Sequence, residues 1–197
     1  EGIEVLDSYA LKSKQCTSVI LPNSLKTIKS MVFQSCNKLK SLSLGSQVEN
    51  IHPWFVYQSG VEEISIDKNN KNYSIRDGAL YNYDGTVFIL PVKPNGTITS
   101  YEIPYGVKKI DDYAFHGQSK LTNITIPNTV TTIGISFQYC GSLANIEIPS
   151  SVTSISSSCF QYCSNLSEIK IHKPQGSIEN APWGATKGDK VLKWVGE

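Results

Sequence analysis

The 197-residue sequence carries little net charge and few of the motifs on which catalysis depends. Its formal net charge is +1, so no overall field attracts nucleic acid or an anionic membrane. It contains three histidines, none of them near a serine or cysteine in a nucleophile motif. A P-loop and the G-x-G-x-x-G, G-x-S-x-G and H-E-x-x-H motifs are missing as well. These absences predict a protein that is not an enzyme, uses no cofactor and does not bind nucleic acid.

Long apolar segments are also missing. The longest apolar runs, residues 54–57 and 87–92, are far shorter than the roughly 20 residues that a membrane-spanning helix needs. We therefore expect no membrane insertion by this segment. The chain begins with Glu1, already inside a repeat, as expected of a processed or trimmed piece of a longer protein.

What the sequence does contain is one apolar frame that recurs every 22 or 23 residues. Residues 121–171 show it twice, as L-x-x-I-x-I-P, a polar step, V-x-x-I, small residues and F-Q-Y-C. A repeat of this length cannot bury its own apolar face, so it predicts a stack of similar coils. Six copies fit the frame, beginning at Ile3, Leu25, Val48, Val107, Val130 and Val152.

Within each copy, L-x-x-I-x-I alternates apolar and polar residues, which predicts a short strand with one buried face. Stacking the copies sets these strands side by side as a parallel sheet with a spacing of about 4.8 Å. V-x-x-I predicts a second, shorter extended segment, and the stretch into A-F-x-x-C predicts one helical turn. Proline follows the strand directly at four places, where the chain must turn: Pro22, Pro104, Pro127 and Pro149.

The five cysteines fall on the same frame. Cys36, Cys140 and Cys163 share one position, three residues before the recurrent Leu, while Cys159 and Cys16 replace other apolar residues. We therefore expect buried free thiols, and the odd count argues against a complete disulfide framework. Only Cys159-x-x-x-Cys163 approaches the spacing of metal ligands, so no metal site is expected.

The pattern L-x-x-I-x-I-P-x-x-V-x-x-I-x-x-x-A-F-x-x-C resembles the BspA-like (treponemal-type) leucine-rich repeat, over residues 3–66 and 98–171. The resemblance implies an α/β leucine-rich-repeat solenoid, curved, right-handed and β-rich, with short parallel strands on one face and short helical turns. It also implies a secreted or cell-surface protein of a bacterium or mucosal protist, with a role in adhesion or host interaction. The family has no catalytic motif, so no functional residues carry over.

We expect a single leucine-rich-repeat domain over residues 1–197. Residues 67–97 break the frame as an irregular insert containing a hairpin, whose type I′ turn is expected at Asp84-Gly85. Residues 172–197 leave the frame and are apolar enough to cap the end of the stack. An insert of the D-G-x-L-Y-N-x-D-G-T type is similar to one found within such repeat arrays, which favours a place inside the solenoid.

Two surfaces could bind a partner. The outward side chains of the repeat strands, from Ser18 and Ile20 to Glu168 and Lys170, are short and polar, although plain solvation explains them equally well. The insert and its C-terminal flank add several tyrosines, of which about half must pack inward. We expect a ligand to bridge the two surfaces, with these candidate residues: Tyr81, Tyr83, Tyr101, Glu102, Asn123, Thr125, Asn145 and Glu147.

The leading hypothesis is a non-catalytic, extracellular or cell-surface module for adhesion and protein–protein interaction, with a host or bacterial surface protein as partner. A carbohydrate-binding module that reads glycan through the insert's tyrosines is the first alternative. A passive stalk that displays another domain is the second. Clustered exposed aromatic rings beside Asp or Asn would favour glycan, and a long bare strand face would favour protein.

Overall fold

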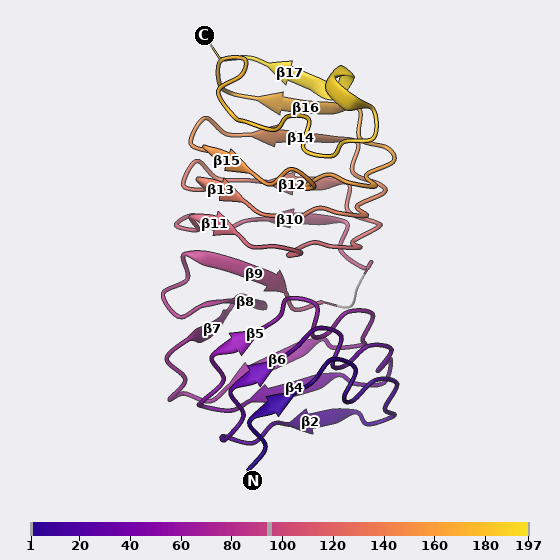
Figure 1. Ribbon diagram of the computed structural model, residues 1–197, viewed down its shortest axis with the longest axis vertical. Coiled ribbons are helices and arrows are strands. Elements are labelled where there is room, and N and C mark those ends of the chain that lie inside the picture. The colour runs from indigo at the N-terminus through magenta and orange to yellow at the C-terminus, as the bar shows by residue number, and fades with distance from the viewer. Residues whose placement is uncertain (1, 94–95, 197) are drawn as a thin grey trace. The chain divides into compact units, whose positions relative to one another are not determined.

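The computed structural model describes residues 2–93 and 96–196 and divides the chain into two compact units. The N-terminal unit comprises Glu1–Gly85 and Leu90–Asn95, and the C-terminal unit comprises Thr86–Ile89 and Gly96–Glu197. Each unit is a β-solenoid of stacked coils, with short strands from successive coils lying side by side (Figure 1). The predicted stack of repeats is therefore confirmed within each unit.

The N-terminal unit has two parallel sheets and a hairpin. The V-x-x-I segments form the sheet β1 (Val5–Leu6), β3 (Thr27–Ile28) and β5 (Asn50–Ile51). The L-x-x-I-x-I segments form the sheet β2 (Ser18–Ile20), β4 (Ser41–Leu44) and β6 (Glu63–Ile66). An antiparallel hairpin, β7 (Tyr73–Arg76) and β8 (Ala79–Asn82), follows the last coil.

The C-terminal unit repeats the arrangement. On one side, Val87 and Phe88 of β9 (Val87–Pro91) pair with β11 (Lys109–Ile110), which is followed by β13 (Thr132–Ile133) and β15 (Ser154–Ile155). On the other side lie β10 (Ser100–Glu102), β12 (Asn123–Thr125), β14 (Asn145–Ile148) and β16 (Glu168–Ile171). A 3-10 helix, η1 (Gly188–Val191), leads into β17 (Leu192–Trp194), which pairs with β16.

The core of the C-terminal unit is a column of aromatic rings between the two sides of each coil. Phe115, Phe137 and Phe160 come from successive coils, and their rings stack with centroids 5.4 and 5.7 Å apart. At the end of the column, the buried ring of Trp183 meets Phe160 edge-on at 6.4 Å. Fully burying one such ring stabilises the fold by about 1.5–3 kcal/mol. Because each ring is buried by the rings of neighbouring coils, each coil depends on its neighbours for this stabilisation.

The expected helical turn at A-F-x-x-C is wrong, and so is the α/β class. In residues 2–93 and 96–196 the one helix is η1. The residue two places after Phe has a left-handed backbone, as in Tyr139 (φ 59°) and Tyr162 (φ 63°), which stops a helix from continuing. The amide of Tyr139 donates instead to the carbonyl of Gln161 in the next coil. The turn is thus a corner that bonds coil to coil.

The expected hairpin is present, since β8 and β9 (Val87–Pro91) are hydrogen-bonded neighbours joined through Asp84 and Gly85, and the hairpin of β7 and β8 precedes it. Register pairs Arg76 with Ala79, so the two turn residues are Asp77 (φ 47°) and Gly78 (φ 70°). Positive φ at both positions is the signature of a type I′ turn. At the expected site only Gly85 has positive φ (81°), and a Cβ there would lie 2.0 Å from the Arg76 guanidinium. Asp-Gly therefore marks a turn at both places, but only the earlier turn has the predicted type I′ geometry.

The segment between β6 and β7 is a turn held by one buried amide. The Nδ2 group of Asn70 donates to the carbonyls of Gly45 and Val48, and its Oδ1 accepts the amides of Asn72 and Tyr73. All four bonding positions of the side chain are therefore used. The hydroxyl of Tyr73 in turn accepts the amide of Ile51, so this tyrosine of the insert covers the edge of β5.

The insert predicted at residues 67–97 is not a separate body, because residues 67–85 and 90–95 belong to one unit and 86–89 to the other. At the C-terminal end, β17 extends the sheet past β16, and Trp183 lies over Phe160. The expectation of one domain over residues 1–197 stays a prediction.

All five cysteines are free, and four are buried, whereas Cys16 is only half-buried. The thiols of Cys36, Cys140 and Cys163 each donate to a carbonyl of the preceding coil, those of Leu11, Phe115 and Phe137. Burial raises the pKa of Cys163 to about 11 and that of Cys140 well above its ordinary value. These thiols therefore stay protonated and serve as small core side chains.

We expect the four buried thiols to resist a thiol reagent at pH 8 and to react fully in denaturant, because the reagent attacks a thiolate that the fold suppresses. The measurement is a thiol titration without reductant, before and after unfolding. Cys16 serves as the internal control, since it is partly accessible. Fewer than five thiols in denaturant would reveal a disulfide.

Ile146→Asp should destabilise the C-terminal unit by more than about 3 kcal/mol, because it buries a carboxylate without a partner. The side chain of Ile146 is only 2% exposed and lies against the core. The neighbouring Asn145→Asp is the matched control, since Asn145 points outward and should tolerate the same charge. Urea unfolding followed by circular dichroism measures both. Equal midpoints for the two variants would contradict the inward and outward assignment.

Candidate functional site

The outward face of β10, β12, β14 and β16 presents polar side chains at fixed spacing. Register places Ser100 beside Asn123 and Glu102 beside Thr125 on the first two strands. It places Asn145 beside Glu168 on the next two strands, with Glu147 beside Lys170. The intervening isoleucines point into the core, as the alternating pattern predicted. The backbone therefore holds these polar groups without any loop.

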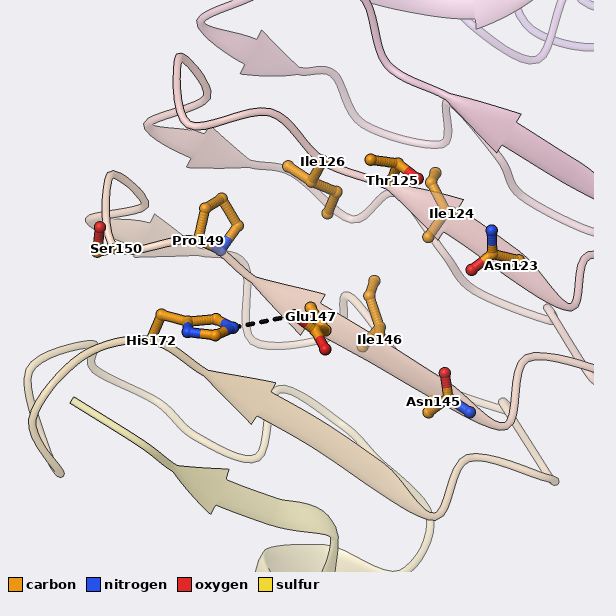
Figure 2. A pocket seen from close by; sticks show the side chains of 10 residues that line it. All are labelled: Asn123, Ile124, Thr125, Ile126, Asn145, Ile146, Glu147, Pro149, Ser150 and His172. Atoms are coloured by element: carbon orange, nitrogen blue, oxygen red, sulfur yellow. Dashed lines mark hydrogen bonds and ion pairs between the residues drawn. The ribbon is translucent and has the colours of Figure 1, made fainter.

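A groove of about 460 Å³ lies on this face, between β12 and β14 (Figure 2). Its volume falls within the range of roughly 300–1,000 Å³ that is usual for ligand pockets. Four of the predicted site residues line it. The lining consists of Asn123, Ile124, Thr125, Ile126, Asn145, Ile146, Glu147, Pro149, Ser150 and His172.

Glu147 is the charged centre of the groove. Its carboxylate accepts a bond from Lys170 Nζ at 2.9 Å and lies 3.0 Å from His172 Nε2. The bond from Lys170, followed by the one from His172, lowers the pKa of Glu147 below its ordinary value. Both bonds are exposed to solvent, so salt screens them. The groove therefore carries a neutralised acid rather than a bare negative charge.

The carboxylate and imidazole do not make a catalytic arrangement with the nearest hydroxyl. Ser150 lines the same groove, but its side chain lies apart from the imidazole and no dashed contact joins them in Figure 2. A hydroxyl nucleophile needs a base within hydrogen-bond reach. Within the described ranges, no group of three or more His, Cys, Asp or Glu could hold a metal ion.

The rings of the predicted site tyrosines are mostly less accessible to a ligand than the residues that line the groove. Tyr81 is 2% exposed, so its ring packs in the core, and burial raises its pKa. Tyr101 is half-buried, with its ring 5.5 Å from that of Phe88 and 5.2 Å from that of Phe115. Only Tyr83 is well exposed, at 55%. The ring of Tyr81 offers little surface to a ligand, because both faces of β8 are covered and Leu80 and Tyr81 are both buried.

The eight predicted site residues are distributed between the two units. Tyr81 and Tyr83 belong to the N-terminal unit, and the other six residues belong to the C-terminal unit. Within the C-terminal unit, Glu102 is exposed on β10, and Asn123, Thr125, Asn145 and Glu147 meet in the groove.

Sequence reasoning missed His172 as a groove residue. It takes the position directly after the strand, where Pro104, Pro127 and Pro149 stand in the preceding coils. That departure from the repeat was a usable signal, because a solenoid places the residues that follow its strands one above another.

Sequence reasoning also missed a pair of exposed tyrosines at the corner of the coil. The rings of Tyr139 and Tyr162 stack with centroids 4.5 Å apart and are 47% and 52% exposed. Beside them, Gln138 Nε2 donates to Gln161 Oε1 at 3.0 Å. The repeated letters F-Q-Y-C were interpreted as frame alone, although only Phe and Cys point inward.

The N-terminal unit has a smaller counterpart of the groove, of about 420 Å³, where β2, β4 and β6 end. Here the hydroxyls of Ser43 and Ser65 bond to each other at 2.8 Å, and Ile20 is 84% exposed. This surface offers no charged pair of the kind that Glu147 and His172 form. It is therefore a matched reference for the groove in the C-terminal unit.

The sequence profile of the BspA type leucine rich repeat region matches residues 2–91 and 94–187, in six copies. A solved leucine-rich repeat protein from Eubacterium ventriosum is similar over 96% of this chain, with 26% identity and a TM-score of 0.72. The pneumococcal vaccine antigen PcpA shares the fold over 92% of the chain, with 19% identity and a TM-score of 0.58. A search among curated proteins gives no match.

This chain spans 50% of the Eubacterium protein and 55% of PcpA. Among the described residues, none lie in a helix long and apolar enough to cross a membrane.

Lys170→Met should raise the pKa of Glu147 toward its ordinary value, because it removes the stronger of the two bonds to the carboxylate. In the wild type, the carboxylate keeps its partners as pH falls until the pH passes this lowered pKa. NMR titration of the side-chain carboxyl carbon measures the shift. Lys193→Met is the control, since Lys193 pairs with Glu168 instead. A pKa that moves in the control and stays in Lys170→Met would contradict the assignment.

Proposed function

Because the chain belongs to the family of BspA-type leucine-rich repeat proteins, we propose that it is a non-catalytic protein-interaction module of a bacterial cell-surface or secreted protein. The observation that carries the proposal is the outward strand face of the C-terminal unit with its groove. Its partner would be a host or bacterial surface protein, which makes adhesion the proposed role.

The rigidity of this face supports binding. Its side chains stand on strands paired in register, such as Asn145 beside Glu168, so they lose little conformational entropy when a partner arrives. The side chains that line the groove at Asn123, Thr125 and Asn145 are short, which further limits the rotamer freedom to be lost. A surface of this kind can hold an extended polar partner across several coils.

Protein is better supported than glycan as the partner. Glycan recognition was expected to use the insert's tyrosines, but Tyr81 is buried and Tyr101 packs against Phe88 and Phe115. The groove is lined by isoleucine, amide, hydroxyl and charged side chains, and its one ring is the imidazole of His172. A sugar would find no aromatic platform to stack on there.

A passive stalk is the remaining alternative, and the groove argues against it. A stalk needs only a stable stack and a solvated surface. The C-terminal unit adds a hollow in which Asn123 and Asn145 stand side by side and Glu147 is oriented by two partners (Figure 2). A stalk has no need of such a hollow, whereas a binding surface uses one.

The test is to pass the purified protein over arrays of extracellular-matrix and surface proteins and, in parallel, over a glycan array. We expect a protein partner, and we expect Asn123→Ala combined with Asn145→Ala to weaken its binding at least tenfold, or about 1.4 kcal/mol. Surface plasmon resonance measures the change. The matched control is Ser18→Ala combined with Ser41→Ala, at equivalent positions of the N-terminal unit. Selective capture of glycans, or equal binding by both double variants, would contradict the proposal.

A further inference from the structure

The strand face of the C-terminal unit is interrupted between β12 and β14. β12 pairs with β10, and β14 pairs with β16, but β12 and β14 belong to separate sheets. No backbone hydrogen bond joins residues 121–127 to residues 143–149, all of which the structure describes. In the N-terminal unit the equivalent sheet β2–β4–β6 is continuous.

The opposite side of the same two coils is intact. Lys109 and Ile110 of β11 pair with Thr132 and Ile133 of β13. At the corner, the amides of Tyr113 and Phe115 donate to the carbonyls of Ile135 and Ser136. The two coils are thus hydrogen-bonded to each other on two sides and not on the third. We call the gap between β12 and β14, on that third side, the slot.

Alternation along the strands identifies which groups lack a ladder partner. The amide of Asn123 donates to Thr99, and the carbonyl of Thr125 accepts from Ile103, so these two residues bond to β10. Ile124, between them, therefore directs its amide and carbonyl toward β14. On β14, Ala144 and Ile148 accept from the coil of β16. Asn145 and Glu147 therefore direct their backbone groups toward β12.

Two facing strand edges with open donors and acceptors are what the main chain of an extended peptide recognises. We infer that the slot between β12 and β14 binds an extended peptide segment of the partner, whose main chain supplies the missing ladder bonds. This inference rests on the proposed function and narrows it to one position and one mode of recognition. Asn145 and Glu147 are exposed, so the backbone groups at this edge of the slot are accessible to a peptide main chain.

The lining of the groove fits a peptide in two further ways. The side-chain amides of Asn123 and Asn145 stand at one end of the slot and can bond to a second stretch of main chain. At the other end, Glu147 is paired with Lys170 and His172, so a neutral peptide meets no unpaired charge. Full insertion would set β12 and β14 about two strand spacings apart, roughly 9.6 Å. The side opposite the slot would act as the hinge.

Hydrogen exchange followed by NMR tests the slot in the free protein. The amides of Ile124, Asn145 and Glu147 should exchange at least tenfold faster than those of Ile103 and His172, which donate across intact ladders. Equal protection of both groups would show that the strands are joined in solution and would overturn the inference. That result would leave the proposed function standing.

Selection from a random linear heptapeptide library on phage, against the immobilised protein, tests the ligand class. An enriched peptide is then synthesised with single N-methyl groups at successive residues. We expect binding to fall at least tenfold at each successive residue that lies between β12 and β14, because the amides of an inserted strand point alternately to one strand and to the other. Peptide binding should also slow exchange at Ile124 and Glu147. Loss of binding at no position would overturn main-chain recognition, loss at alternate positions only would show pairing with one strand and overturn insertion, and a library that yields no binder would overturn the ligand class.

Asn145→Tyr should fill the slot and weaken the enriched peptide at least tenfold. Ser41→Tyr is the matched control at the equivalent residue of β4, on a continuous sheet, and should change binding less than twofold. Thermal melting of both variants checks that the fold is kept. A protein partner that binds wild type and Asn145→Tyr equally would keep the proposed function and refute the slot. Absence of any protein partner would refute the proposed function itself.

Discussion

The structure depends on the sharing of one apolar column between consecutive coils. A single coil of 22 or 23 residues has too little interior to exclude water from Phe137, but with coils above and below it the ring is fully buried. The stability of each coil therefore depends on its contacts with the adjacent coils, as expected of a repeat fold in which each repeat contacts only its neighbours. Every other feature, from the register of the strands to the position of the groove, follows from stacking coils so that these rings coincide.

The strands and the core were predictable because they follow from a local pattern repeated six times. Alternation in L-x-x-I-x-I fixes which face of Ile124 and Ile146 is buried, whatever the coil is stacked on. The corner was not predictable in the same way. Tyr139 and Tyr162 occupy a left-handed conformation that residues other than Gly, Asn and Asp seldom adopt, so local preference pointed to a helical turn. Bonds to the next coil outweigh that preference.

The candidate site likewise combines residues that the sequence predicted with residues that it did not. Asn123, Thr125, Asn145 and Glu147 were found because outward positions on a strand are periodic. The burial of Tyr81 was not predicted, because both faces of β8 are covered and the sequence of an irregular segment does not reveal this. His172 follows the strand in place of a proline, which only a comparison of coils reveals. The interruption between β12 and β14 has no signature in the letters, since Ile124 and Ile146 fit the frame as well as any other pair.

The interruption also sets how the C-terminal unit would carry mechanical load. Tension along the stack is borne at most levels by hydrogen bonds on both strand faces and at the corner. Between the coils of β12 and β14, it rests on the β11–β13 pairing, the corner bonds of Tyr113 and Phe115, and the apolar contacts of the core. We expect this level to part first when the unit is pulled, because fewer hydrogen bonds join its two coils.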